Sequence, residues 1–349
     1  MSCGVDSSTA VKLLQDQGYK VSGATMKLYS NDDLMLEKTK TCCALNDVED
    51  AKYVAYKLDI QFYIFNFQDD FSENVMDVFV NTYLNGGTPN PCVDCNKKMK
   101  FERFLKRAEE LDYNFIATGH YVQKEFDKES GRWLLKRSLD TKKDQSYVLY
   151  GLTQHQLEHT IFPCGNLPKE KIRIIAEENK LLNANKPDSQ DICFVPDGDY
   201  ASFIEKRTGT SSPKGEMVLL DGTVLGQHNG LIRYTIGQRR GLGVSYSQPL
   251  FVIEKDIENN RIILGTQEQL FRTSLVASDV NFISFETLTH PIEVTAQTRY
   301  HQLDTPATIS PLDDGKVLVE FKEPKSAISK GQAVVFYNGE YVVGGGTIE

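Results

Sequence analysis

Strand-like and helix-like segments alternate along roughly the first 200 residues, and this alternation constrains the fold more than any other feature of the chain. The helix-like segments are 47–58, 71–84 and 101–111, and the strand-like segments are 20–26, 61–67 and 115–120. Such alternation predicts an α/β fold with a doubly wound parallel sheet. Ligands of these sheets bind beyond the carboxyl ends of the strands, where Met26, Gly119 and His120 lie.

The second half of the chain has a different residue pattern. From about residue 202, glycines separate short segments and the helical periodicity fades. We therefore predict three domains: an α/β domain over 1–203, a small mostly-β linking domain over 204–268, and a C-terminal β-barrel over 269–349.

Composition narrows the class of protein. The 349 residues are 40% hydrophobic and 25% charged, as in ordinary globular proteins, and no apolar run is long enough to span a membrane. The chain has only seven cysteines, an odd number that includes the adjacent pair Cys42-Cys43, which favours a reducing compartment and predicts a cytoplasmic protein without a membrane partner. A net charge of −9 disfavours a general nucleic-acid coat. Local basic clusters, such as the one over 97–107, are read first as solvated helix surface.

The chain opens with a loop of small residues. Residues Ser2–Ser8 precede a helix-like segment that starts at Thr9. Backbone N–H groups at a helix start, together with the helix dipole, form a site for anions such as phosphates. We expect Ser7 and Ser8 to donate hydroxyl hydrogen bonds there, and Asp6 to be able to hold Mg²⁺ on a bound nucleotide.

A second motif concerns sulfur. Asn90 and Pro91 precede Cys92 and Cys95, and the prolines around Asn90 predict that both thiols lie at the start of a helix. A helix start, with Lys97 and Lys98 nearby, is expected to lower the thiol pKa values. Such a pair is half of a metal or iron–sulfur site, a redox pair, or a nucleophile beside a bystander. Cys193, far downstream, taken alone is best read as a small buried apolar residue.

Many motifs occur together in one order, and together they resemble the tRNA-specific 2-thiouridylases, a family of the PP-loop ATP pyrophosphatases. The matching segments are 2–8, 88–91 with 95–97, 117–121, 143–147, 188–190 with 192–194, 234–242, 299–300 and 331–333. The resemblance extends through nearly the whole chain. It implies that ATP adenylates the C2 oxygen of the wobble uridine of lysine, glutamate and glutamine tRNAs, and that sulfur from a cysteine persulfide displaces AMP.

The same resemblance assigns roles to single residues. It implies that Cys193 carries the persulfide and that Cys95 is the catalytic nucleophile. The residues implied to bind ATP are Met1, Ser2, Cys3, Gly4, Val5, Asp6, Ser7, Met26 and Gly119. The residues implied to contact the target base are Asn90, Pro91 and Cys92, and those implied to contact tRNA are His120, Lys143, Asp144, Gln145, Arg299, Tyr300 and Gln332. The implied partners are tRNA and a persulfide donor, either a cysteine desulfurase or a relay protein.

Three departures from the family pattern leave alternatives open. Cys3 replaces a usual glycine, only Met1 stands where a buried strand usually precedes the loop, and Cys92 replaces an aspartate that many members have. Cys92, Cys95 and Cys193 together could anchor an iron–sulfur cluster, although we favour the persulfide route. The rival functions are a different PP-loop enzyme and a non-catalytic or cluster-dependent tRNA-binding protein with an impaired ATP loop.

Overall fold

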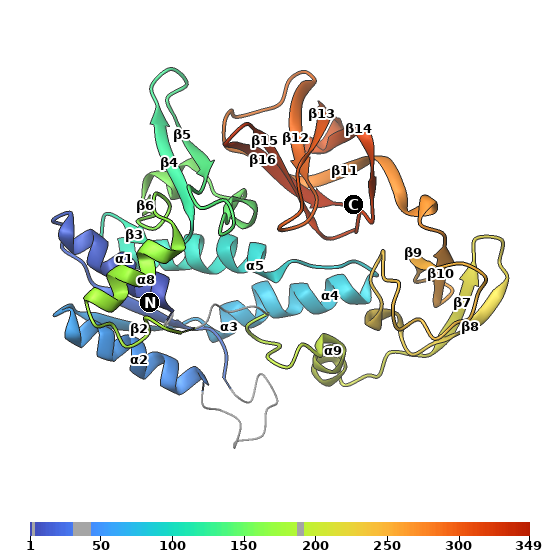
Figure 1. The fold of residues 1–349 in the computed structure, drawn as a ribbon, viewed down its shortest axis with the longest axis horizontal. Coiled ribbons are helices and arrows are strands. Elements are labelled where there is room, and N and C mark those ends of the chain that lie inside the picture. Colours follow the sequence, from blue (N-terminus) through green and yellow to red (C-terminus); the bar gives the residue numbers. More distant parts are fainter. Residues whose placement is uncertain (2–3, 31–42, 187–191) are drawn as a thin grey trace.

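The computed structural model describes residues 1, 4–30, 43–186 and 192–349. Figure 1 shows three parts: an α/β region that contains the N-terminus, a β region around residues 215–265, and a barrel near the C-terminus. The helices between Gln68 and Glu109 run through the middle of the molecule and connect these parts (Figure 1). In the described part of the chain, no helix combines the length and the apolarity that a membrane crossing requires.

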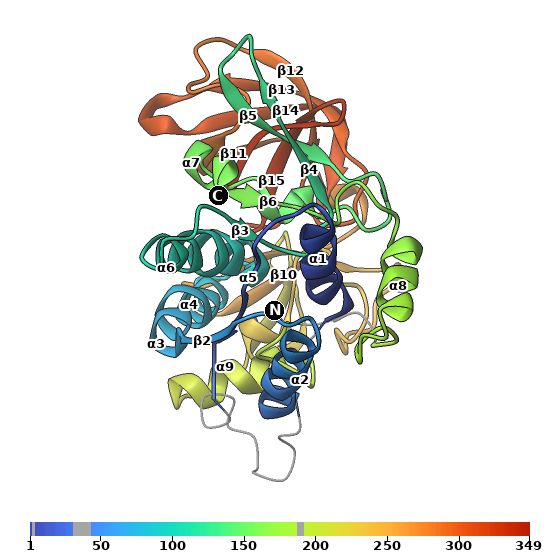
Figure 2. The ribbon, with the colours of Figure 1, turned by 90° about the vertical axis from the view of Figure 1, so that its left-hand side faces the viewer.

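The N-terminal region confirms the predicted parallel α/β architecture. Strand β1 (Gly23–Lys27) pairs in parallel with β2 (Phe62–Asn66), and β3 (Ile116–Ala117) pairs in parallel with β6 (Thr160–Ile161). The surrounding helices are α1 (Val5–Asp16), α2 (Cys43–Lys57), α7 (Gln154–Glu158) and α8 (Lys169–Glu178). Helices α1 and α8 lie side by side (Figure 2). Their buried apolar side chains, including Val5, Ala10 and Ile172, form one core.

Helix α1 begins earlier than the sequence predicts. Gly4 caps the helix in an extended conformation, and helical geometry starts at Val5 rather than at Thr9. The hydroxyls of Ser7 and Ser8 donate to the Gly4 carbonyl, at 3.1 and 3.3 Å. Short hydroxyl side chains satisfy a helix carbonyl in this way, so these residues belong to the helix and not to a preceding loop.

Two helices, each with a π-helical stretch in its middle, form what we call the central ridge. The first comprises α3 (Gln68–Phe71), a π-helical stretch (Ser72–Asp77) and α4 (Val78–Leu84). The second comprises α5 (Pro91–Asp94), a π-helical stretch (Cys95–Arg103) and α6 (Phe104–Glu109). The second helix thus starts ten residues before the predicted 101, because Pro91 at its first position has its backbone torsion fixed for helix entry.

A hairpin that the sequence analysis did not anticipate leaves the α/β region. Strands β4 (Val122–Asp127) and β5 (Arg132–Arg137) are antiparallel, and β5 joins the barrel sheet through the pair Tyr341 and Lys136. The α/β region and the barrel therefore share a sheet and a hydrophobic core that includes Tyr147, Val335 and Tyr337.

The middle region is mostly β, as predicted. Its sheet has the order β8 (Val224–His228), β7 (Gly215–Leu219), β10 (Arg261–Gly265) and β9 (Phe251–Asp256). Helix α9 (Tyr200–Thr208) precedes it and packs Phe203 and Ile204 into the core of the central ridge. The described residues also include short 3₁₀ helices at Ser146–Leu149, Leu231–Arg233, Glu268–Leu270 and Asp313–Gly315.

The predicted C-terminal barrel is confirmed. In spatial order its strands are β11 (Phe271–Phe282), β14 (Val317–Ser326), β13 (Thr305–Pro311), β12 (Ile292–Gln297), β15 (Ala333–Asn338) and β16 (Tyr341–Ile348). Pairing of β16 with β11, for example Ile348 with Ala277, closes the barrel. Alternating apolar side chains such as Val294, Ala296 and Ile309 fill its interior.

Candidate active site

The start of α1 lies against the end of β3. A side-chain carbon placed on Gly119 would lie 2.8 Å from both the Cβ of Asp6 and the backbone nitrogen of Ser7. A glycine is therefore required for this close approach. Asn183 donates to the Gly4 carbonyl at 3.1 Å and to the Ser8 hydroxyl at 2.7 Å, so it fixes the same helix start.

Only some of the other residues that were predicted to bind the nucleotide can be placed near this point. Met1 lies along β1, because its carbonyl accepts a hydrogen bond from Thr25 at 2.6 Å, and Met26 is the next residue of that strand. Val5 is buried in the core beneath α1. Ser2 and Cys3 lie outside the described residues, as does the segment 187–191 with its predicted motif.

Asp6 already has strong partners. The Lys169 ammonium lies 2.7 and 2.8 Å from its two carboxylate oxygens, and the Tyr121 hydroxyl donates to it at 2.6 Å. The Lys169 side chain is only 9% exposed. These contacts do not fit Mg²⁺ at Asp6, because the ion would have to displace an ammonium group that already neutralises the carboxylate.

Cys92 and Cys95 lie at a helix start, as predicted. Pro91 and Val93 are buried and anchor the first turn, while Cys92 is exposed and Cys95 is partly buried. The amide of Gln332, which comes from the barrel, donates to the carbonyls of Thr88 and Pro89 at 2.9 and 3.1 Å. The barrel thus holds the turn that precedes Asn90, Pro91 and Cys92.

Cys193 reaches the same neighbourhood from a distant part of the chain. Phe194 is buried and packs against Phe71 and Phe79, with ring centroids 5.7 and 5.2 Å apart. Cys95 and Ile192 pack against the same hydrophobic cluster, and Cys193 itself is exposed. The expectation from its local sequence alone, a buried apolar residue, is therefore wrong.

The thiols do not have the lowered pKa values that the helix start predicts. Desolvation by the surrounding protein raises the pKa of Cys92 and Cys95, and Lys100 opposes this increase in part. Desolvation also raises the pKa of Cys193 to about 12; Cys95 and Cys92 raise it further, and Lys100 opposes them. The prediction was wrong because loss of water outweighs the helix start.

The charges of Lys97 and Lys98 act elsewhere. Burial raises the pKa of Asp94 to about 6, and these two lysines limit the increase. Asp94 lies between the two cysteines of the helix start. A carboxyl group with this pKa changes its protonation near neutral pH.

His120 is buried beside Lys100. Its side chain is buried, with 8% exposure, and its Nδ1 lies 2.8 Å from the Thr118 hydroxyl. Its Nε2 lies 3.5 Å from the Lys100 ammonium. Burial and the charge of Lys100 hold the pKa of His120 well below its usual range, so the imidazole is neutral.

Four of the residues suggested for RNA contact meet at the seam between the α/β region and the barrel. Asp144 accepts hydrogen bonds from Ser138 and Ser146, which fixes the 143–145 turn, and Gln145 accepts one from the Tyr121 backbone at 2.9 Å. The Tyr300 hydroxyl donates to the Asp144 carbonyl at 3.2 Å. Lys143 belongs to the same turn.

Arg299 connects the barrel to the middle region. Its Nη2 donates to the carbonyls of Ile236 and Ala327, at 3.2 and 2.8 Å, and lies 3.2 Å from the Ser329 hydroxyl. Desolvation lowers the pKa of its guanidinium, and Tyr147 opposes the change. The guanidinium of Arg299 therefore helps to hold the barrel to the middle region.

Sequence reasoning missed three residues of this site: Lys100, Tyr121 and Lys169. Lys100 belongs to a run of basic residues that is typical of a solvated helix face, and Tyr121 was noted only as the last residue of a matching motif. Lys169 carries no local signal, because its partner Asp6 is 163 residues away in the chain.

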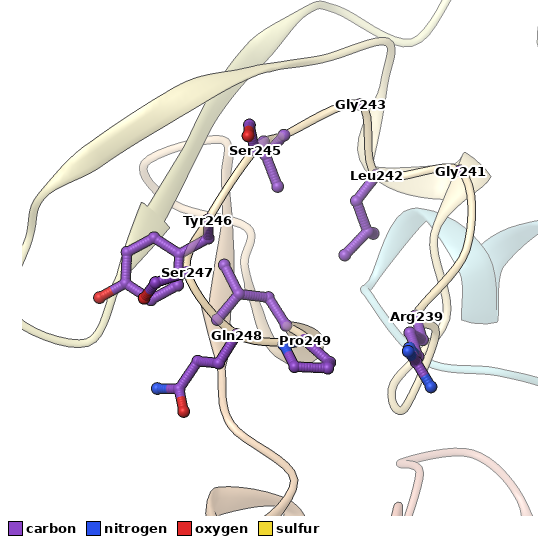
Figure 3. A pocket seen from close by; sticks show the side chains of 11 residues that line it. Arg239, Gly241, Leu242, Gly243, Ser245, Tyr246, Ser247, Gln248 and Pro249 are labelled. Atoms are coloured by element: carbon purple, nitrogen blue, oxygen red, sulfur yellow. The ribbon is translucent and has the colours of Figure 1, made fainter.

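The described residues contain no group of three or more His, Cys, Asp or Glu side chains positioned to hold a metal ion. A separate hollow of about 480 Å³ lies in the middle region, where the segment from Arg239 to Leu250 folds around it (Figure 3). None of the predicted site residues lines this hollow.

Comparison with known families covers almost the whole chain. Residues 1–197 match a family model described as tRNA methyl transferase HUP domain. Residues 201–266 match the tRNA methyl transferase PRC-barrel domain, and residues 272–348 match the aminomethyltransferase beta-barrel domain.

Full-length relatives agree on one name. The chain is similar to the tRNA-specific 2-thiouridylase MnmA of Clostridioides difficile strain 630, with 50% identity over 349 residues, which cover 100% of this chain and 96% of the relative. It is 48% identical over 349 residues to tRNA-specific 2-thiouridylase MnmA 1 of Clostridium botulinum strain Loch Maree, covering 100% of this chain and 98% of the relative.

Proposed function

The chain belongs to the tRNA-specific 2-thiouridylase family, and from that membership we propose the route by which its residues bring sulfur to a tRNA uridine. The chain is a tRNA sulfurtransferase. The family models mention methyl transfer, whereas the full-length relatives are named for thiolation. Cys95 and the Cys193 segment, which share one cluster, favour sulfur chemistry.

The first step activates the uridine. A C2 carbonyl is a poor electrophile, so the C2 oxygen attacks the α-phosphorus of ATP, pyrophosphate leaves with the P–O electron pair, and N3 loses its proton. We assign ATP to the start of α1, with Gly4, Asp6 and Ser7 on the helix and Gly119 facing them. The closeness of Gly119 to Asp6, where an added side-chain carbon would lie 2.8 Å from the Asp6 Cβ, supports this assignment. Met1, Ser2, Cys3, Val5 and Met26 complete the proposed ATP set.

The second step delivers sulfur. We assign a persulfide to Cys193 and the nucleophile to Cys95. The Cys95 thiolate attacks the Sγ of Cys193, the S–S bond breaks, and its electron pair leaves on the terminal sulfur as hydrosulfide. Hydrosulfide adds to C2, and AMP leaves with the former C2 oxygen. An external dithiol then reduces the Cys95–Cys193 disulfide.

The RNA is placed by groups from two regions. We assign the target base to Asn90, Pro91 and Cys92, whose turn is held by the barrel through Gln332. In an anticodon loop, taking a base out of its stack costs little free energy. Lys143, Asp144, Gln145, Arg299 and Tyr300 are proposed to contact the tRNA, as are His120 and Gln332. The meeting of the 143–145 turn with Tyr300 at one seam supports this grouping.

Two further parts of the proposal concern the cell. A cysteine desulfurase or a relay protein supplies the persulfide, and the wobble uridine of lysine, glutamate and glutamine tRNAs receives it. We place the reaction in the cytoplasm, because a reducing compartment regenerates the two thiols after each turnover.

The observation that carries the proposal is the packing of Cys95 and of Ile192 and Phe194, which flank Cys193, on one hydrophobic cluster. The test incubates the protein with ATP, a persulfide donor and unmodified tRNA, and detects thiolated tRNA by its slowed migration in a mercury-containing gel. Cys95→Ser and Cys193→Ser should each abolish the shift. Cys164→Ser is the matched control, because Cys164 belongs to a different cluster from Cys95 and a serine can keep its contact with the Asp6 carbonyl. A normal shift with either site variant would remove that residue from the mechanism.

A further inference from the structure

The helix that carries Cys92 and Cys95 is wound more widely than an α-helix. It is π-helical from Cys95 to Arg103, and the Phe104 N–H donates to the Met99 carbonyl five residues back. In such a helix, residues five apart lie closer to the same side than they do in an α-helix, where they diverge widely. The wider winding therefore brings Lys100 toward the side of the helix on which Cys95 lies.

Three other cations of this helix have carboxylate partners, which Lys100, like Lys97 and Lys106, lacks among the described residues. Lys98 pairs with Glu102 at 3.2 Å, Arg103 with Asp70 at 2.6 Å, and Arg107 with Glu110 at 2.6 Å. Among the residues that the structure describes, no carboxylate lies within ion-pair distance of Lys100.

The polar partner that Lys100 does have carries no charge. The imidazole of His120 lies 3.5 Å from the ammonium, and its other nitrogen lies beside the Thr118 hydroxyl. An ammonium group has three donors, and a neutral imidazole accepts at most one of them. A half-buried cation with donors to spare is best stabilised by an anion that arrives during the reaction.

The nearby groups that can become anions are thiols. The charge of Lys100 acts on Cys92, Cys95 and Cys193, and in each case it opposes the effect of desolvation. The other groups that act on Cys95 are Cys92 and Asp94, and both disfavour its thiolate. Of the groups that act on Cys95, Lys100 is thus the one that favours the thiolate.

We propose that Lys100 is a positioning residue for sulfur transfer, whose ammonium holds the Cys95 thiolate and then the departing hydrosulfide. The proposal rests on the Cys95–Cys193 route described above. Negative charge moves from the Cys95 sulfur to the terminal persulfide sulfur as one S–S bond forms and another breaks. Lys100 exchanges no atom or proton in this step.

The test measures the thiolate of Cys95 directly. The rate at which iodoacetamide alkylates Cys95 is followed from pH 7 to pH 10.5, and tandem mass spectrometry assigns the label to that residue. In Lys100→Met, the midpoint should rise by about one pH unit, which lowers the rate at pH 8 about tenfold. Lys100→Arg should keep the wild-type profile, because the charge remains. Lys98→Met, on the same helix, should also keep it.

A structural role alone would not move this profile in one direction with the loss of charge and restore it with arginine. Lys100→Gln, which can still hydrogen-bond to His120, gives the same test if the methionine variant does not fold. Unchanged profiles in the neutral variants, with sulfur incorporation intact in the wild type, would overturn this inference alone. A wild-type chain that incorporates no sulfur, while Lys100 still controls the Cys95 profile, would instead overturn the proposed function.

Discussion

The Lys169 ammonium bridges both carboxylate oxygens of Asp6, at 2.7 and 2.8 Å, and so joins the first turn of α8 to the first turn of α1. Both helix starts carry positive potential, and the Asp6 carboxylate is favourable at its own helix start. Tyr121, directly before β4, completes the arrangement. Three segments that are distant in the chain are thereby fixed around the proposed phosphate site.

Removing the cation should cost stability. Lys169→Met leaves a carboxylate that is 29% exposed without its main partner, and we expect a loss of about 1–3 kcal/mol in the free energy of unfolding, measured with urea. The control is Lys12→Met, whose pair with the exposed Asp16 should contribute less than about 1 kcal/mol. Adding Asp6→Asn to Lys169→Met should recover part of the loss. Equal effects of the two lysine variants would contradict this account.

Asp94 should make stability depend on pH. Its pKa is raised to about 6 by burial, above the value of about 3.9 in an unfolded chain. The folded state therefore holds the proton more tightly, and ionised Asp94 destabilises the fold as the pH rises through 6. Asp94→Asn should add about 2 kcal/mol to the free energy of unfolding at pH 8 and almost nothing at pH 4.

The control for this experiment is Glu129→Gln in the exposed turn of the β4–β5 hairpin. It should show the same small difference at both pH values. A gain for Asp94→Asn that is as large at pH 4 as at pH 8 would show that ionisation is not its cause.

The barrel should support catalysis through Gln332. Its amide donates to the carbonyls of Thr88 and Pro89, and the Lys330 carbonyl accepts from the Thr88 N–H at 2.8 Å. Gln332→Ala should lower the free energy of unfolding by about 1 kcal/mol and slow thiolation of tRNA more strongly, because the turn before Asn90 loosens. Single-turnover thiolation measures the effect. Gln267→Ala, at an exposed position, is the control, and matching rates for the two variants would refute the idea.

Arg299 should matter for the junction between the barrel and the middle region. Arg299→Met leaves the carbonyls of Ile236 and Ala327 without this donor, so calorimetry should show a loss of about 2 kcal/mol. Arg299→Lys should recover only part, because an ammonium lacks the planar fork of a guanidinium. Arg240→Met, at an exposed position, should be close to neutral. Full recovery with lysine would mean that charge alone is needed.

Local sequence patterns predicted much of this molecule. The parallel α/β region, the helix start at Cys92 and Cys95, and the barrel all follow from periodicity and turn residues, which are local properties. The thiol pKa values could not be predicted in this way, because they depend on water excluded by distant segments. The same holds for Lys169, whose partner Asp6 is far away in the chain. It also holds for Lys100, whose position relative to Cys95 depends on the winding of the helix.

The hairpin of β4 and β5 has a consequence for how this protein can be recombined. Since β5 extends the barrel sheet at Lys136, and Tyr147 packs with Val335 and Tyr337, the barrel is not an interchangeable module. Chimaeras that exchange only residues beyond 269 between relatives would mismatch a continuous interior. A working exchange must carry the stretch from Val122 to Leu157 with the barrel, so these two portions should co-evolve as one inherited unit.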